Sequence, residues 1–331
     1  MGLLVTDVTL RDFRNFERLD LSLSPGVTVL VGPNAVEAVQ LLTSGTSFRR
    51  PTPVQLVREG ATSARIDARL VGDGRVVDHR CDATPGGRRF SRNGKRCRAA
   101  DMPEELPSVL FSPDDLALVK RGASQRRDEL DLLGRQVSRG YAHVLAEYQR
   151  AVDQRNRLLR DERVDLSLLD AWDASVALGG ATLLAARMRL FVRLAEKVGE
   201  AYGVISGGEA LSCSYVCTLG ENLEEMGRDE LRDVFLDRLE AGRAEDLRRQ
   251  QTCVGPHRDD VSFVVGGRDA RAFASQGQQR SVVLALKMAE VELAGEILGS
   301  RPILLLDDVM SATRPAAPPW SASSARGSRR S

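Results

Sequence analysis

A long helical block separates two strand-rich regions, and this arrangement constrains the fold more than any other feature of the sequence. From about Ser124 to Arg163, charged and apolar residues alternate at helical spacing with almost no glycine or proline, and a second such stretch covers residues 171–202. This spacing places the apolar residues on one face of a helix. The sequence therefore predicts a sheet-containing domain that is split by a helical insert.

The region before this block is typical of a sheet with one helix attached. Strands are predicted over residues 3–10 and 17–24, followed by a Pro25-Gly26 turn and a buried apolar run, VTVLV, over residues 27–31. A helix is predicted from Val36. Further hairpins are expected around residues 72–74 and at Asn93-Gly94, a strong two-residue turn signal.

The strand pattern returns after Gly203. We expect a strand over residues 210–219, two short helices over 229–240 and 244–251, and a hairpin near 261–273. A helix over 279–298 and a strand over 302–308 follow. The sheet thus resumes on the far side of the insert.

Composition indicates a soluble globular protein, with 42% apolar and 28% charged residues among 331. The net charge is only +1, so any surface for a polyanion must be local. The odd number of cysteines, without a paired CxxC spacing, favours reduced thiols rather than a metal site: Cys81, Cys97, Cys213, Cys217 and Cys253. We expect no run of ~18 apolar residues, no signal peptide and a cytoplasmic location.

The last twenty residues, 312–331, contain 17 Ala, Pro, Ser or Arg and no acidic residue. Such a composition cannot form a core. The abrupt change after PILLLDDVMS favours a shifted reading frame or a cloning artefact over a natural disordered tail.

Three segments resemble the RecF family in order and spacing. They are residues 10–34, residues 110–131, and the late series GPHRDD, SQGQQRS and ILLLDD, which starts at Gly255, Ser275 and Ile303. The resemblance covers residues 1 to 311. It implies an α/β fold, an ABC-type ATPase head with a P-loop NTPase-like sheet and an inserted helical lid. The implied domains are an N-terminal lobe (1–120), the lid (121–203), the C-terminal part of the head (204–311) and an aberrant tail (312–331).

The resemblance also implies a function. RecF proteins resemble the heads of SMC-type ATPases, in which two subunits hold two ATP molecules between them and grip DNA. It implies binding of single- and double-stranded DNA, a weak DNA-dependent ATPase that uses ATP and Mg²⁺, and an ATP-dependent homodimer. It further implies RecO and RecR as partners in gap repair, replication restart and SOS induction.

Asp307 and Asp308 follow a run of four apolar residues. Ligands bind at the carboxyl ends of parallel strands, and there one carboxylate can hold Mg²⁺ while the next orients an attacking water. We therefore assign both residues a catalytic role and Asp307 a metal role. The alternative is that the pair only ends a strand.

The segment Ser275, Gln276, Gly277 and Gln278 opens a helix, whose N–H groups can face a phosphate. By resemblance, this signature motif contacts the γ-phosphate that the other subunit holds. Ser275 and Gln278 also form a potential capping box. The two interpretations are compatible, because both use the same helix end.

The phosphate loop is incomplete. A P-loop requires G-x-x-x-x-G-K-[ST], yet the chain retains only Gly32, Pro33 and Asn34 as a remnant nucleotide-binding segment, and about six residues are absent. Asn34 and Glu37 have the spacing of a local helix cap. No lysine occurs between residues 1 and 94, and Arg11 or Arg14 cannot restore the cradle. We therefore expect ATP binding to be impaired.

A second departure from the family follows Ser311, where ATRPAAPP replaces a loop of the ELD type that crosses the dimer interface. Communication between subunits should fail. The strand ILLL should become an exposed apolar edge that promotes aggregation.

A basic segment from Gly86 to Ala100 surrounds the Asn93-Gly94 turn and contains no acidic residue. It predicts a DNA-contacting hairpin, against the alternative of a solvated face, and its candidate contacts are Arg88, Arg89, Arg92, Lys95 and Arg96. Arg49 and Arg50 are weaker candidates. By resemblance, His257 and Arg258 serve nucleotide or interface geometry.

Two alternatives remain for the function. One is a scaffold that binds DNA or RecR without nucleotide control. The other is the inert product of a decayed gene.

Overall fold

A six-stranded antiparallel sheet forms the first part of the chain in the computed structural model, which describes residues 2–29, 36–221 and 223–307. The strand order is β2-β1-β3-β4-β5-β6. The strands are β1 (Leu4–Phe13), β2 (Phe16–Ser22), β3 (Ala64–Gly72), β4 (Arg75–Thr84), β5 (Gly87–Arg92) and β6 (Lys95–Cys97). The predicted hairpins are confirmed: Asp73-Gly74 and Asn93-Gly94 both have positive φ at each residue, as a two-residue hairpin turn requires.

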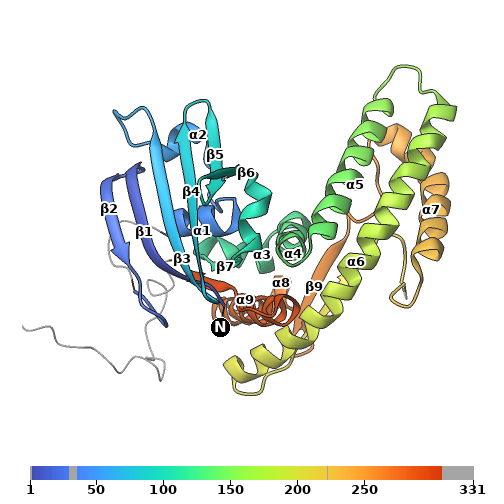
Figure 1. Ribbon diagram of the computed structural model, residues 1–331. Helices are drawn as coiled ribbons and strands as arrows, with labels where there is room; N and C mark the ends of the chain where they lie inside the picture. The colour runs from blue at the N-terminus through green and yellow to red at the C-terminus, as the bar shows by residue number, and fades with distance from the viewer. Residues whose placement is uncertain (1, 30–35, 222, 308–331) are drawn as a thin grey trace, which may run out of the picture.

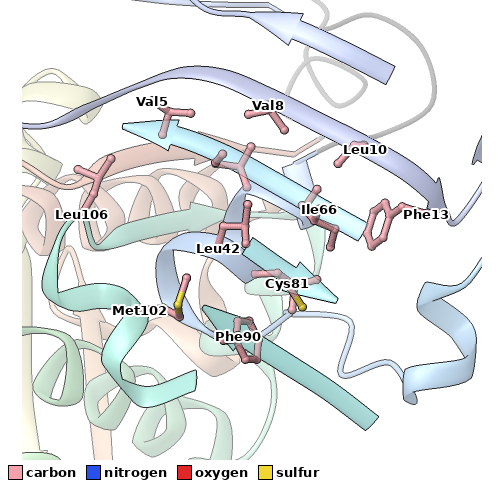
Figure 2. Close-up of a cluster of buried hydrophobic side chains, with 14 of the residues drawn as sticks. Val5, Val8, Leu10, Phe13, Leu42, Ile66, Cys81, Phe90, Met102 and Leu106 are labelled. Atoms are coloured by element: carbon pink, nitrogen blue, oxygen red, sulfur yellow. The ribbon is translucent and has the colours of Figure 1, made fainter. Parts of the chain in front are cut away.

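One face of this sheet carries the first core. Alternate residues along β3 and β4 are buried, and they pack against α1 (Val36–Ser44). In Figure 2, Leu42 of α1 lies among Ile66, Cys81 and other apolar side chains of the sheet. The opposite face bears polar and charged side chains. A short helix, α2 (Pro53–Leu56), closes one end of the core with the buried Leu56.

A parallel pair of strands, β7 (Ser108–Phe111) and β11 (Ile303–Leu306), connects this lobe to the rest of the protein. The segment η1 (Ala99–Glu104) precedes β7, and η2 (Pro113–Leu116) and α3 (Ala117–Lys120) follow it. Among the described residues, each strand of the pair has the other as its only partner strand. Leu304 and Leu306 are 39% and 44% exposed, so the expected apolar edge is confirmed.

The buried strand predicted over residues 27–31 is wrong where the structure describes it. Residues 27–29 form no strand, and Val27 and Val29 are 85% and 77% exposed. Residues 30 and 31 lie outside the described residues. We attribute the difference to the short connection that follows the run. Only four residues separate it from α1, in which residues 37–44 are all buried.

The helical block forms an arm that extends from the centre to the right of Figure 1. It consists of α4 (Ala123–Val137), α5 (Arg139–Leu158) and α6 (Leu166–Ser206), with α7 (Arg228–Arg249) packed alongside. The prediction of two short helices over 229–251 is wrong, because α7 continues through Gly242. A helical glycine costs about 1 kcal/mol, whereas Phe235 before it is fully buried and Asp246 after it is held by Arg155.

A second antiparallel sheet lies against α6 and α9 (Gln276–Leu298). It contains β8 (Leu211–Val216), β9 (Asp260–Val265) and β10 (Arg268–Asp269), followed by α8 (Ala270–Phe273). The β9–β10 hairpin is confirmed. The expected strand is shorter, since β8 ends before Cys217, and all five cysteines are free.

These elements form the α/β fold with a long helical insert that the sequence predicts. The division at residues 120, 203 and 311 stays a prediction. In α6, one 18-residue window is long and apolar enough to cross a membrane, contrary to our expectation. Because 56% of that window is buried and α6 contributes to two core clusters, it has the character of a core helix.

Candidate nucleotide and nucleic-acid sites

Asp307 directly follows β11, at the carboxyl end of the parallel pair. Its N–H donates to the carbonyl of Phe111 at 2.8 Å, which extends the pairing by one residue. The side chain is 7% exposed, and Oδ2 lies 3.7 Å from Nη2 of Arg49. The predicted placement of Asp307 at a strand end is therefore confirmed, while Asp308 lies outside the described residues.

Arg49 and Arg50 are not free cations. Arg49 stacks over the ring of Phe48, with 5.2 Å between its guanidinium carbon and the ring centroid, and also faces Asp307. Arg50 pairs with Asp128 of α4 at 2.9 Å. This second pair crosses a cleft of about 970 Å³ between the N-terminal lobe and α4. Both side chains thus make contacts within the chain, and their weaker candidacy for DNA contact stays a prediction.

The first turn of α1 contains a carboxylate network that sequence reasoning missed. Both Glu37 oxygens accept hydrogen bonds from Arg14, at 2.8 and 2.9 Å, and Oε1 also accepts from Ser47 Oγ at 2.5 Å. Glu37 is 3% exposed. Its carboxylate is thus held by Arg14 and Ser47, and its predicted cap with Asn34 stays a prediction. Gly32, Pro33 and Asn34 lie outside the described residues.

Ser275 caps the N-terminus of α9. Its Oγ accepts from the Gln278 N–H at 3.2 Å, and Gln278 Oε1 accepts from the Ser275 N–H at 2.9 Å, which completes the predicted capping box. Gln278 Nε2 also donates to Glu209 at 2.9 Å. Ser275, Gln276 and Gly277 are exposed. The helix end is thus capped by its own residues and open to solvent.

The basic hairpin divides into paired and exposed cations. Arg92 contacts Glu104 and Glu105 at 3.2 and 3.0 Å, and Arg98 contacts Asp101 at 2.7 Å. These acids belong to η1 and its end, so a sequence window that stops at Ala100 underestimates the negative charge nearby. Four candidates remain exposed, and their side chains have no hydrogen bond or ion pair to the described chain: Arg88, Arg89, Lys95 and Arg96.

His257 belongs to an internal network. Its Nε2–H donates to the carbonyl of Thr252 at 3.1 Å, which leaves Nδ1 to accept from Tyr148 Oη at 2.6 Å. Burial lowers the pKa of His257 to about 4, so the ring is neutral near pH 7. Arg258 also donates to the Thr252 carbonyl, at 3.0 Å. Both side chains thus fix the geometry of this loop, and their role in nucleotide or interface geometry stays a prediction.

The loop 255–260 lies where the arm meets the second sheet. Arg126 of α4 forms a bidentate pair with Asp260 at 2.7 and 2.8 Å. Arg187 of α6 donates to the Pro256 carbonyl at 2.7 Å, and Asp259 accepts from Tyr215 at 2.8 Å. Three separate elements therefore hold this loop. Helical spacing alone gives no signal for such buried arginines, because their partners are distant in sequence.

The chain is similar to named proteins over most of its length. The DNA replication and repair protein RecF of Roseiflexus castenholzii is 38% identical over 340 residues, covering 93% of this chain and 86% of the relative. The RecF of Desulforudis audaxviator is 39% identical over 317 residues, covering 92% and 86%. The chain belongs to the RecF family.

Solved structures agree with this assignment to the RecF family. The recombination mediator protein RecF of the RecFOR pathway, as RecF-ATPrS and as RecF-ATP, matches with TM-scores of 0.88 and 0.87 at 29% and 28% identity. These matches cover 95% of this chain and 87% of each RecF chain. An Smc head domain from Pyrococcus furiosus, 15% identical with a TM-score of 0.50, shares the fold. No protein-family model matches the chain.

Proposed function

We propose that this chain is a RecF-type recombination and repair protein that contacts DNA through the β5–β6 hairpin without control by nucleotide. The observation that carries the proposal is the set of four exposed cations on that hairpin. In addition, the first turn of α1 already contains a carboxylate, that of Glu37. RecF relatives are DNA replication and repair proteins, which supports DNA as the ligand.

The described residues do not fit a triphosphate at α1. A helix N-terminus binds phosphate through free N–H groups and a positive dipole. Here the Glu37 carboxylate lies in the first turn and repels an anion, and Arg14 is already paired with it. The sequence offers no P-loop lysine. ATP binding is therefore expected to be weak or absent.

Mg²⁺ has one described candidate ligand. Asp307 has the oxygen chemistry that Mg²⁺ prefers, yet its carboxylate is nearly buried and faces Arg49. A cation beside this carboxylate opposes metal binding. We therefore derive no hydrolytic step and treat Asp307 as a remnant of the site.

Partner assignments follow from family membership. RecR and RecO are proposed partners, because solved RecF relatives are described within the RecFOR pathway. Single- and double-stranded DNA are the proposed nucleic-acid ligands, in the cytoplasm. An ATP-dependent homodimer requires a bound nucleotide, so we do not expect one here.

The DNA contact is tested by fluorescence anisotropy with labelled DNA at several salt concentrations. We expect Arg88→Ala with Lys95→Ala to weaken binding and lower the salt slope by about 0.9 per lost phosphate contact on duplex. Arg98→Ala is the matched control, because Arg98 is equally local but paired with Asp101. Equal losses in both variants would contradict the hairpin assignment.

Nucleotide independence is tested on the same protein. DNA affinity should not change when ATP and Mg²⁺ are added, and labelled ATP should show no saturable binding. Saturable binding that Asp307→Asn changes would overturn this part of the proposal.

The alternative of an inert product makes a different prediction. It expects aggregation and a broad, non-cooperative thermal transition. A single sharp transition with salt-sensitive DNA binding would exclude it.

A further inference from the structure

The outer face of the six-stranded sheet carries a row of charged side chains, four arginines and one aspartate. Strand register places Arg11 of β1 directly opposite Arg18 of β2 on one side and Arg65 of β3 on the other. The same row continues through Asp82 of β4 to Arg89 of β5. Cross-strand partners point to the same face of a sheet, opposite the face that packs on α1 in Figure 1.

Ion pairs neutralise only part of this face. Four arginine–aspartate pairs lie on it: Arg18–Asp20 at 2.7 Å, Arg65–Asp82 at 2.8 Å, Arg80–Asp67 at 2.5 Å and Arg69–Asp78 at 3.0 Å. Within the described chain, Arg11, Arg89 and Arg96 are exposed and have no ion pair, whereas Asp7 is the one carboxylate on this face without one. The unpaired charge is therefore positive and concentrated toward the Arg11 row.

Adjacent like charges work against the fold. Side chains directly opposite each other on neighbouring strands are close enough for like charges to destabilise the pairing. Arg11 has such neighbours on both sides, Arg18 and Arg65, whereas Arg89 lies opposite Asp82. A bound polyanion would remove the repulsion.

The dimensions of the row match an extended polyanion. Five neighbouring strands at ~4.8 Å spacing extend the row across roughly 19 Å. Duplex DNA carries one negative charge per ~1.7 Å of its axis. A single small phosphate would occupy one position, whereas a DNA backbone can meet Arg11 and Arg89 together.

We propose that this outer face binds the phosphate backbone of duplex DNA and continues the contact made by the β5–β6 hairpin. The inference rests on the proposed DNA-binding function and assigns it a second surface. Duplex is favoured over single strands because the described outer positions hold no aromatic residue: they are mostly Arg, Asp, Ser and Thr, with the exposed Leu4, Val71 and Val76 paired at one end. Binding of single strands commonly relies on bases stacked on aromatic rings.

The test compares salt-dependent anisotropy on a duplex and on a single strand of equal length. We expect Arg11→Ala, a change on β1 outside the β5–β6 hairpin, to lower the duplex salt slope by about 0.9 for one lost contact, with a smaller effect on the single strand. Arg69→Ala with Asp78→Ala is the matched control, since these two exposed side chains lie on the same face and neutralise each other, so that the face keeps its net charge. Its slope should stay unchanged.

A variant that should raise duplex affinity excludes misfolding as the cause of a loss of binding. Asp82→Asn releases Arg65 and removes a negative charge from the row, so duplex affinity should rise. An unchanged slope in Arg11→Ala, while wild type binds duplex, would overturn this inference alone. An equal loss on single strands would overturn the duplex assignment, and a wild-type chain that binds no DNA would overturn the proposed function as well.

Discussion

Lys287 of α9 forms a buried ion pair with Glu129 of α4, and only 3% of the lysine side chain is exposed. Glu290 lies 3.5 Å from the same ammonium group. Burial by itself would lower the pKa of Lys287, but the neighbouring carboxylates Glu129 and Glu290 raise it above its usual value. The charged lysine therefore joins the arm to the helix that begins at the signature segment.

Removal of this buried charge should destabilise the fold. Lys287→Met keeps the apolar stem but leaves Glu129 without its counter-ion, and we expect a loss of about 3 kcal/mol in the free energy of unfolding. Urea denaturation measures it. Lys197→Met is the control, because Lys197 pairs with the exposed Glu292 and Glu296 at the surface and should cost less than about 1 kcal/mol. Equal losses of unfolding free energy in the two variants would show that the buried pair stabilises the fold no more than the surface pair.

Gly255 cannot accept a side chain. Its φ is +117°, and an added Cβ would lie 2.4 Å from Phe235 Cζ and 2.6 Å from Tyr148 Oη. Gly255→Ala should therefore cost about 2–4 kcal/mol through overpacking and backbone strain. Gly267→Ala, at φ +77° in open space, should cost about 1 kcal/mol. Thermal or urea unfolding distinguishes them, and similar values would contradict the packing argument.

Local signals in the sequence predicted much of the fold. The Asn93-Gly94 turn, the period of the helices and the apolar run before Asp307 each depend on neighbouring residues, and each is confirmed. The run over residues 27–31 failed, because an apolar run becomes a strand only when a partner strand lies within reach. That condition depends on distant parts of the chain.

The candidate sites were predicted less completely for the same reason. Arg92 belongs to a cationic window in sequence, yet Glu104 and Glu105 neutralise it in space. Arg155 continues the buried stripe of Tyr148 and Val152 on α5, yet helical spacing does not reveal its partners Asp173 and Asp246. Only strand register reveals that Arg11 lies opposite Arg18 and Arg65.

The exposed edge of β11 should promote aggregation. Leu306→Lys places a charge on that edge and should lower light scattering at high protein concentration without a change in melting temperature. Leu305→Lys is the control, since Leu305 is 8% exposed and its replacement should unfold the lobe. Unchanged scattering in Leu306→Lys would mean that this edge is not the aggregation site.

The neutral His257 should make stability depend on pH. Burial lowers its pKa to about 4 from a usual 6.5, so between these values the unfolded chain binds a proton that the folded chain does not. The contribution is complete above about pH 6.5 and is lost as pH falls toward 4, by about 3 kcal/mol at most. His257→Asn should remove this part of the dependence of the unfolding free energy on pH, measured from pH 4 to 7. Parallel pH profiles for the variant and wild type would show that the ring is protonated in the fold, which would leave the Tyr148 hydrogen bond to Nδ1 without an acceptor.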